Sequence, residues 1–311
     1  MGDPRPIGFF DSGVGGLTVL VEVMRRLPRE DTIYLGDNAR TPYGPRPDEE
    51  VVRFSTECLD ALAERDVKAI VVACNTSTAI ALPILRRRYA LPILGVVRPG
   101  ATAAVLATRT RAIGLIATQA TVRSHAYFEA IKEEDPFVEV YEHATPELVP
   151  LVEAGRLSGP DVEVVLRRAL APLLGSQALG DGARDESFIF PMPSDARIDT
   201  LLLGCTHYPL LGPVIRGLVG DDIAVIDSAS ATASALASLM EVHALGAPGR
   251  PQGRHLMLTT GDAEAFRGTA RLLFGEAFGT VETLDIEAGA AVLAAATTGT
   301  PDVAATPASR A

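Results

Sequence analysis

Two cysteines in this 311-residue chain stand in matching settings that could hold reactive thiols. Cys74 follows the apolar run 69–73, Cys205 follows the apolar run 200–203 and a glycine, and hydroxyl or amide residues come after each. In an α/β fold the carboxyl end of a parallel strand borders the ligand crevice, and a following helix start favours the thiolate form of a cysteine. A lone buried cysteine is more often a packing residue. Two in matched settings favour a pair of thiols that give and take protons.

The matching settings belong to a longer internal repeat. The stretch 7–12 has a counterpart in 113–118. Cys74 lies 63 residues after Asp11, and Cys205 lies 87 residues after Thr118. The excess of 24 residues equals the length of the tract 176–199, which is rich in Gly, Asp, Ser and Pro and is expected to be a surface loop. The strands of any parallel sheet resemble one another, so coincidence remains an alternative. The repeat favours two related α/β units that face each other across a cleft, each contributing one thiol.

Other polar residues follow the same strand ends. Asp11 and Ser12 open the glycine-rich turn 11–16, which either points both side chains into the cleft or caps the next helix. The turn lacks the spacing of a phosphate-binding loop, and its aspartate would repel phosphate. His207 comes two residues after the second cysteine, where it could share a proton with the thiol or fill a structural role. Cys58 lies on the apolar face of a predicted helix, so we expect it to be inert packing.

The elements that must position these residues alternate along the chain in the way typical of α/β proteins with buried parallel strands. We predict strands over 7–10, 32–35, 69–73, 93–96, 112–116, 200–203 and 224–226. Helices are predicted over 17–27, 49–65, 77–88, 124–133, 158–174 and 229–245. Proline and glycine favour a hinge at residues 98–100.

These elements predict an α/β protein of two pseudo-symmetric, parallel-sheet domains with the active site in the cleft between them. We assign residues 1–98 and 209–287 to the first domain, which holds Cys74. Residues 99–208 form the second domain, which holds Cys205 and carries the loop insertion near 176–199. Residues 288–311 are rich in Ala, Thr, Gly and Pro and are expected to be a disordered tail.

Composition and charge limit the partners of the protein. There are 28 Lys and Arg against 39 Asp and Glu, a formal charge of −11, so nucleic-acid binding is not expected. The amino-terminal residues have no signal-peptide core, and no apolar run is long enough to span a membrane. Three cysteines without paired spacing, and without clustered histidines, predict free thiols in a reducing cytoplasm rather than disulfides or a zinc site.

Five segments closely resemble those of the glutamate racemases, within the aspartate/glutamate racemase family. They are FDSGVGGL at 10–17, YLGD at 34–37, PYG at 42–44, CNT at 74–76 and LGCTHYPL at 203–210. The resemblance runs from about Ile7 to Asp227, and it is specific because several separate motifs occur in order at the expected separations. It implies an isomerase that interconverts L- and D-glutamate without a cofactor and supplies D-glutamate for bacterial peptidoglycan.

The resemblance also implies roles for particular residues. Cys74 takes the Cα proton from D-glutamate, and Cys205 takes it from L-glutamate. Ten further residues are implied in substrate binding: Asp11, Ser12, Tyr43, Gly44, Asn75, Thr76, Thr206 and His207, with Thr118 and Thr121 as additional hydroxyls. Asp37 and Glu153 fall at acidic positions that support the site.

The expected partners are the small-molecule substrate glutamate and a second copy of the chain in a homodimer. No motif for a pyridoxal lysine, a metal or a flavin is evident in the sequence. Two alternatives remain at this stage, an aspartate racemase of the same superfamily and a non-catalytic binding module for acidic amino acids.

Overall fold

The computed structural model describes residues 2–174, 197–249, 251–275, 278 and 280–286. Most of the predicted surface loop 176–199 and the whole predicted tail 288–311 lie outside these residues. Within the described ranges, no helix has the length and apolar character needed to cross a membrane.

The first sheet has six parallel strands in the order β10-β9-β2-β1-β3-β4. They are β1 (Ile7–Asp11), β2 (Thr32–Gly36), β3 (Ala69–Val72), β4 (Ile93–Gly95), β9 (His255–Thr259) and β10 (Val281–Thr283). The first three strands are buried along their whole length, as their continuous apolar runs predict for a parallel sheet covered on both faces.

The second sheet has four parallel strands in the order β6-β5-β7-β8. They are β5 (Ala112–Ala117), β6 (Glu139–Ala144), β7 (Thr200–Gly204) and β8 (Ala224–Asp227). This order repeats the order β2-β1-β3-β4 of the first sheet, with β5 in the place of β1 and β7 in the place of β3. The predicted internal repeat is therefore a repeat of topology, and the predicted α/β fold with two parallel sheets is confirmed.

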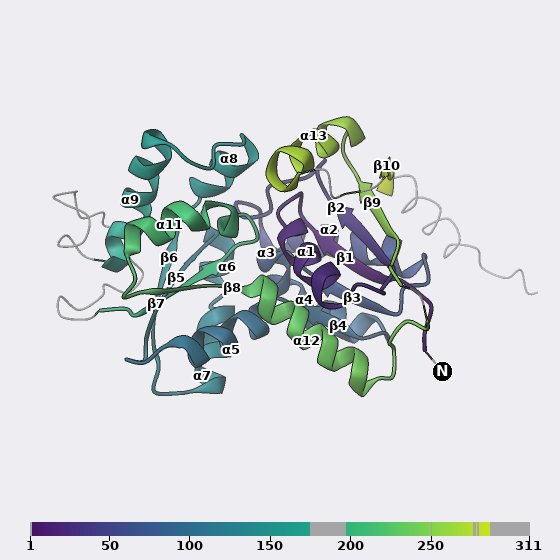
Figure 1. The fold of residues 1–311 in the computed structure, drawn as a ribbon, viewed down its shortest axis with the longest axis horizontal. Helices are drawn as coiled ribbons and strands as arrows, with labels where there is room; N and C mark the ends of the chain where they lie inside the picture. Colours follow the sequence, from purple (N-terminus) through teal and green to yellow (C-terminus); the bar gives the residue numbers. More distant parts are fainter. Residues whose placement is uncertain (1, 175–196, 250, 276–277, 279, 287–311) are drawn as a thin grey trace, which may run out of the picture.

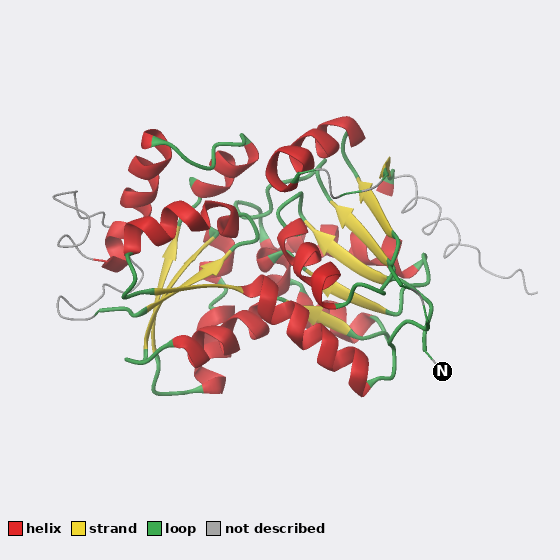
Figure 2. Cartoon of the chain, viewed as in Figure 1, coloured by secondary structure: helices red, strands yellow, loops and turns green. Residues whose placement is uncertain are grey.

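Helices cover both faces of each sheet (Figures 1 and 2). In the first half these are α1 (Leu17–Arg26), α2 (Asp48–Ala63), α3 (Asn75–Ile80), α4 (Leu82–Arg88) and α13 (Ala263–Phe274). In the second half they are α5 (Val97–Ala107), α6 (Gln119–Arg123), α7 (Ala126–Glu134), α8 (Leu148–Glu153), α9 (Pro160–Leu174), the short 3₁₀ helix η1 (Tyr208–Leu211) and α11 (Gly212–Val219). Helix α12 (Ser228–Val242) packs on both α1 and α5 and so joins the two halves (Figure 1).

Two features of the predicted organisation are wrong. Strand β8 pairs with β7, so the segment from 209 through β8 belongs to the second sheet, not to the first domain. The reason is that the apolar residues 224–226 complete the second sheet before the chain returns through α12. The predicted hinge at 98–100 lies inside the first turn of α5, where proline is tolerated because its missing N–H has no helical partner to lose.

Candidate active site

A cavity of about 190 Å³ lies between the two domains, at the carboxyl ends of the central strands. Its walls come from both halves of the chain, as the location of crevices in parallel α/β sheets predicts. The lining residues are Ser12, Thr41, Pro42, Tyr43, Gly44, Pro45, Cys74, Asn75, Thr76, Thr118, Gln119, Pro146, Val149, Pro150, Cys205, Thr206 and His207.

Cys74 lies at the start of α3, directly after β3. Its Sγ accepts the backbone N–H of Ser77 at 3.5 Å, and its S–H donates to the hydroxyl of Ser12 at 3.6 Å. Burial raises the pKa of the Cys74 thiol to about 11, the charge of Asp11 adds to the rise, and the contacts with Ser77 and Ser12 oppose it. At neutral pH this sulfur is therefore a protonated thiol.

Cys205 lies after β7 and is paired with a histidine. Its Sγ is 3.7 Å from Nδ1 of His207, whose Nε2 lies 3.4 Å from a carboxylate oxygen of Glu153. The latter pair is at ion-pair distance but is not aligned for a hydrogen bond. Burial by itself lowers the pKa of His207, but the neighbouring Cys205, Glu153 and Asp11 outweigh it and raise the pKa to about 10. The imidazole is accordingly charged at neutral pH.

The turn after β1 packs against the segment that holds the second thiol. The Asp11 carboxylate is fully buried, accepts the Gly13 N–H at 3.0 Å and accepts the Thr206 hydroxyl at 3.4 Å. Burial raises the pKa of Asp11 although His207 opposes the rise. A Cβ at Gly15 would lie 2.5 Å from the Thr206 hydroxyl oxygen, so only glycine fits this approach.

Tyr43 lines the cavity from the loop after β2, and its hydroxyl is hydrogen-bonded on the side away from the cavity. Its hydroxyl donates to the carboxylate of Asp37, which also accepts from the Arg40 guanidinium at 2.8 Å and from the Thr260 hydroxyl at 2.6 Å. Asp37 is fully buried and does not line the cavity. Its place in the structure is that of a support for the tyrosine and the loop that carries it.

A triangle of hydroxyl groups joins the two domains on another side of the cavity. The Thr76 hydroxyl lies 2.9 Å from that of Thr118 and 3.3 Å from that of Thr121, and the last two lie 2.9 Å apart. Gly44 packs closely on Thr118, because a Cβ there would lie 3.0 Å from the Cβ of the threonine. The hydroxyls of Thr76 and Thr118 line the cavity, and each can turn a proton toward a bound anion.

The structure brings the predicted site residues together around this cavity. Four of them stand behind its lining: Asp11, Asp37, Thr121 and Glu153. Sequence reasoning missed several lining residues, namely Thr41, Pro42, Pro45, Gln119, Pro146, Val149 and Pro150. Three of these follow β6, a strand that was not predicted, so their position at a strand end was not visible. Cys58 is buried in the core with Phe54 and Leu59, as expected for packing.

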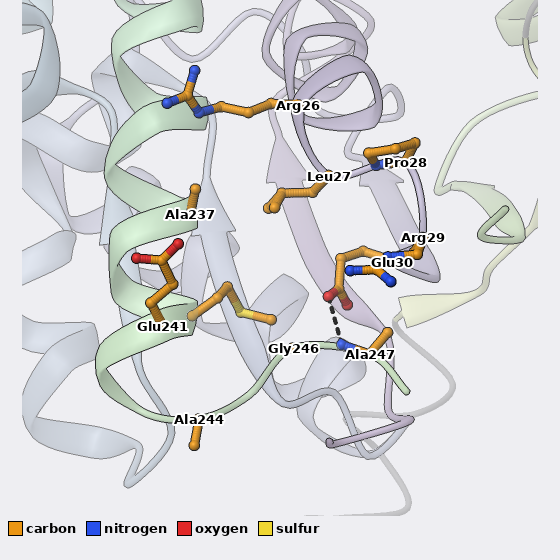
Figure 3. Close-up of a pocket in the computed structure, with 11 residues that line it drawn as sticks. Arg26, Leu27, Pro28, Arg29, Glu30, Ala237, Glu241, Ala244, Gly246 and Ala247 are labelled. Carbon is orange, nitrogen blue, oxygen red and sulfur yellow. Dashed lines mark hydrogen bonds between the residues drawn. The ribbon is translucent and has the colours of Figure 1, made fainter. Parts of the chain in front are cut away.

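A second, larger cavity of about 350 Å³ lies elsewhere in the first domain (Figure 3). It is formed by the carboxyl ends of α1 and α12 and by the segment that precedes β2. Figure 3 shows the Glu30 carboxylate bonded to the backbone N–H of Ala247, at 2.8 Å. The cavity holds neither matched cysteine, and it borders the amino end of β2, the end opposite to that where the thiols lie. The volume of a cavity therefore does not by itself identify the candidate active site.

Comparison with known proteins gives one consistent result. Residues 12–179 match the family model described as Asp/Glu/Hydantoin racemase. The chain is 43% identical to glutamate racemase of Shouchella clausii over 86% of this chain and 89% of that protein. The crystal structure of a glutamate racemase isoform from Bacillus anthracis superposes with a TM-score of 0.81 at 38% identity, covering 90% of this chain and 97% of the other. A structure from Francisella tularensis, in complex with D-glutamate, has a TM-score of 0.78 at 31% identity and covers 92% and 99% of the two chains.

Proposed function

This chain belongs to the Asp/Glu/hydantoin racemase family, and on that premise we propose that it is an isomerase that interconverts L-glutamate and D-glutamate through two thiols. The observation that carries the proposal is that Cys74 and Cys205, which follow corresponding strands of the two domains, line one cavity. Removal of a proton from one face of Cα and its replacement from the other face require two such opposed groups. In the cell the product D-glutamate would serve peptidoglycan synthesis.

The choice of glutamate rests on the named relatives and on the chemistry of the cavity. Relatives that are about 40% identical over most of the chain are glutamate racemases, and one solved neighbour binds D-glutamate. The protein carries a formal charge of −11, so long-range attraction does not draw in a dicarboxylate. Local donors must capture it, and the Asn75 amide and the hydroxyls of Thr76 and Thr118 are available in the lining.

We infer a symmetric reaction with two directions. With D-glutamate, the Cys74 thiolate takes the Cα proton and the Cys205 thiol returns its proton to the opposite face, which leaves a Cys74 thiol and a Cys205 thiolate. With L-glutamate the two sulfurs exchange roles. Hydrogen-bond donors already directed into a closed site stabilise the carbanion-like state without reorganisation, so the proposal needs no cofactor.

The surroundings of the two sulfurs differ in a way that bears on the resting state. The Cys74 thiol, with its pKa raised to about 11, holds its proton at neutral pH. Cys205 instead lies 3.7 Å from Nδ1 of His207, whose own pKa is raised to about 10. We therefore propose that His207 exchanges protons with Cys205, whereas Cys74 contacts Ser12 and Ser77. Asp11, which is close enough to influence both Cys74 and His207, is placed to help redistribute protons between turnovers.

The decisive experiment substitutes each thiol separately. Cys74→Ser and Cys205→Ser should each reduce racemisation by at least about 100-fold, because each removes one acid/base group. Cys58→Ala is the matched control, since Cys58 is buried in the core and does not line the cavity, and it should keep near wild-type turnover. Near wild-type activity in either serine variant would refute the two-thiol scheme.

A second measurement tests the two faces and the absence of a cofactor. Starting from one enantiomer in heavy water, early product should carry solvent deuterium at Cα, whereas retention of the substrate hydrogen would indicate a single shared base. The protein, dialysed against a chelator and without added pyridoxal phosphate, should keep full activity. Strong turnover of aspartate with none of glutamate would overturn the substrate.

Assembly and location complete the proposal. We propose that the chain acts as a homodimer in the cytoplasm, where its three free thiols would remain reduced. Light scattering at several protein concentrations tests the dimer, and cell fractionation tests the location.

A further inference from the structure

The Asn75 amide oxygen has a hydrogen-bond partner, whereas its amide nitrogen has none within the described residues. Its Oδ1 accepts a hydrogen bond of 2.6 Å from the hydroxyl of Tyr127. Its Nδ2 is buried and has no hydrogen-bond partner within the described chain, although Asn75 lines the cavity. Because the oxygen is already occupied, the two N–H groups of this amide are what remains for a ligand.

Tyr127 comes from the other domain and is itself held in place. It lies in α7 and is fully buried, and its hydroxyl packs against Gly100 of α5, which also packs against Ser228 at the start of α12. Burial raises the pKa of Tyr127 well above its usual value, so the phenol keeps its proton. The phenol donates its single proton to the Asn75 amide oxygen, and this bond determines which end of the amide faces Tyr127.

The backbone of α5 packs against both of these side chains. A Cβ at Gly100 would lie 3.0 Å from Cβ of Ser228 and 3.3 Å from the hydroxyl oxygen of Tyr127. Three helices, α5, α7 and α12, thus fix the position of one hydroxyl group. The contacts of Gly100 also explain why a glycine stands inside a helix at a cost in helix propensity.

We propose that Tyr127 is a positioning residue that orients the Asn75 amide with its Nδ2 toward a substrate carboxylate, and that the close packing of Gly100 on the Tyr127 hydroxyl holds the phenol in this role. The inference rests on the proposed function, because the carboxylate is that of glutamate. Without the phenol proton the amide can turn over and present its oxygen to the carboxylate, which repels it. This pair of contacts, from Tyr127 to Asn75 and from Asn75 to the substrate, is called the relay below. It acts on substrate binding and not on the two thiols.

A double-mutant cycle tests the relay in the full-length chain. The proteins are wild type, Tyr127→Phe, Asn75→Ala and the double variant, with Tyr89→Phe as control because its hydroxyl bonds to Asp60 outside the site. The readouts are KM and kcat in both directions and glutamate binding by calorimetry. Tyr127→Phe should raise KM about tenfold for both enantiomers and change kcat less than about threefold. In the Asn75→Ala background the same change should alter KM and affinity less than about twofold.

Each outcome decides the matter. An unchanged KM in Tyr127→Phe would overturn the positioning role of Tyr127, and so would an equal rise in KM in the wild-type and Asn75→Ala backgrounds. Racemisation by the wild type would still leave the proposed function intact. If Tyr127→Phe does not fold, Gly100→Ala takes its place, because the added methyl group crowds the Tyr127 hydroxyl, and its rise in KM must also vanish in the Asn75→Ala background. A wild-type chain that neither racemises nor binds glutamate overturns the proposed function and the relay together.

Discussion

Gly15 in the first domain and His207 in the second are in direct contact across the cleft, and a Cβ at Gly15 would lie 2.7 Å from Nδ1 of the histidine. That nitrogen is also the one that faces the Cys205 sulfur. The turn after β1 therefore determines where the histidine stands, although the two residues are far apart in sequence.

Gly15→Ala should reduce racemisation about tenfold or more, because the added methyl group must displace His207 or Thr206 from the thiol. The measurement is kcat/KM in both directions beside the thermal midpoint. Gly268→Ala is the control, since Gly268 lies in α13 with nothing within 4 Å of the new Cβ. That change should leave activity unaltered and increase stability slightly. Equal activity of the two variants would contradict the role of the contact.

The pH dependence of stability should carry the signature of His207. Its pKa is raised from 6.5 to about 10 in the folded protein, so the folded state binds the proton more tightly than the unfolded state. The contribution is complete below pH 6.5 and is lost as pH rises toward 10, with a limiting slope of about 1.4 kcal/mol per pH unit. Urea unfolding between pH 6 and 10 should show a shallower decline for His207→Asn than for wild type. Parallel curves would show that the histidine is not charged in the fold.

The Asp37 carboxylate, which accepts the hydrogen bond from Tyr43, should contribute more to the free energy of unfolding than the tyrosine hydroxyl does. Asp37→Asn removes one of the two carboxylates paired with the Arg40 guanidinium, the other being that of Glu57, and should cost about 2 kcal/mol of unfolding free energy. Tyr43→Phe removes one hydrogen bond and should cost about 1 kcal/mol, while both changes should raise KM. Glu22→Gln, which breaks an exposed pair with Arg25, should cost less than about 0.5 kcal/mol. Urea unfolding gives the three values, and the reverse order for Asp37 and Tyr43 would refute the arrangement.

The hydroxyl triangle should couple the two domains energetically. Thr76→Val and Thr118→Val each break contacts between the domains, so the double variant should lose less stability than the sum of the singles, by about 0.5–1 kcal/mol. Thr56→Val is the comparison, because the Thr56 hydroxyl bonds only within α2, to the Val52 carbonyl. Paired with Thr76→Val it should give strict additivity. Additivity in both cycles would mean that the triangle carries no coupling.

Much of the fold was predictable from local patterns. All seven predicted strands exist, because short apolar runs buried on both faces leave a clear signal. Strand β6 was missed since its sequence EVYEHA places charged residues on an edge strand that is only partly buried. Strands β9 and β10 were missed too, and the latter has only three residues, two of them exposed.

The sequence by itself determined which two thiols are candidates for the chemistry and that they stand in matching positions of a repeat. The two thiols, the repeat that carries them and the candidate binding residues are all local features, because a cysteine after an apolar strand can be recognised without knowledge of the rest of the chain.

Only the tertiary structure decided how those groups act on one another. The contact of Gly15 with His207, the bond from Tyr127 to Asn75 and the assignment of β8 to the second sheet all join segments that are far apart in the chain. The physical reason is that hydrogen bonds and close approaches between distant segments leave no periodic trace in the sequence. They exist only once the two sheets are formed and their strand ends face each other.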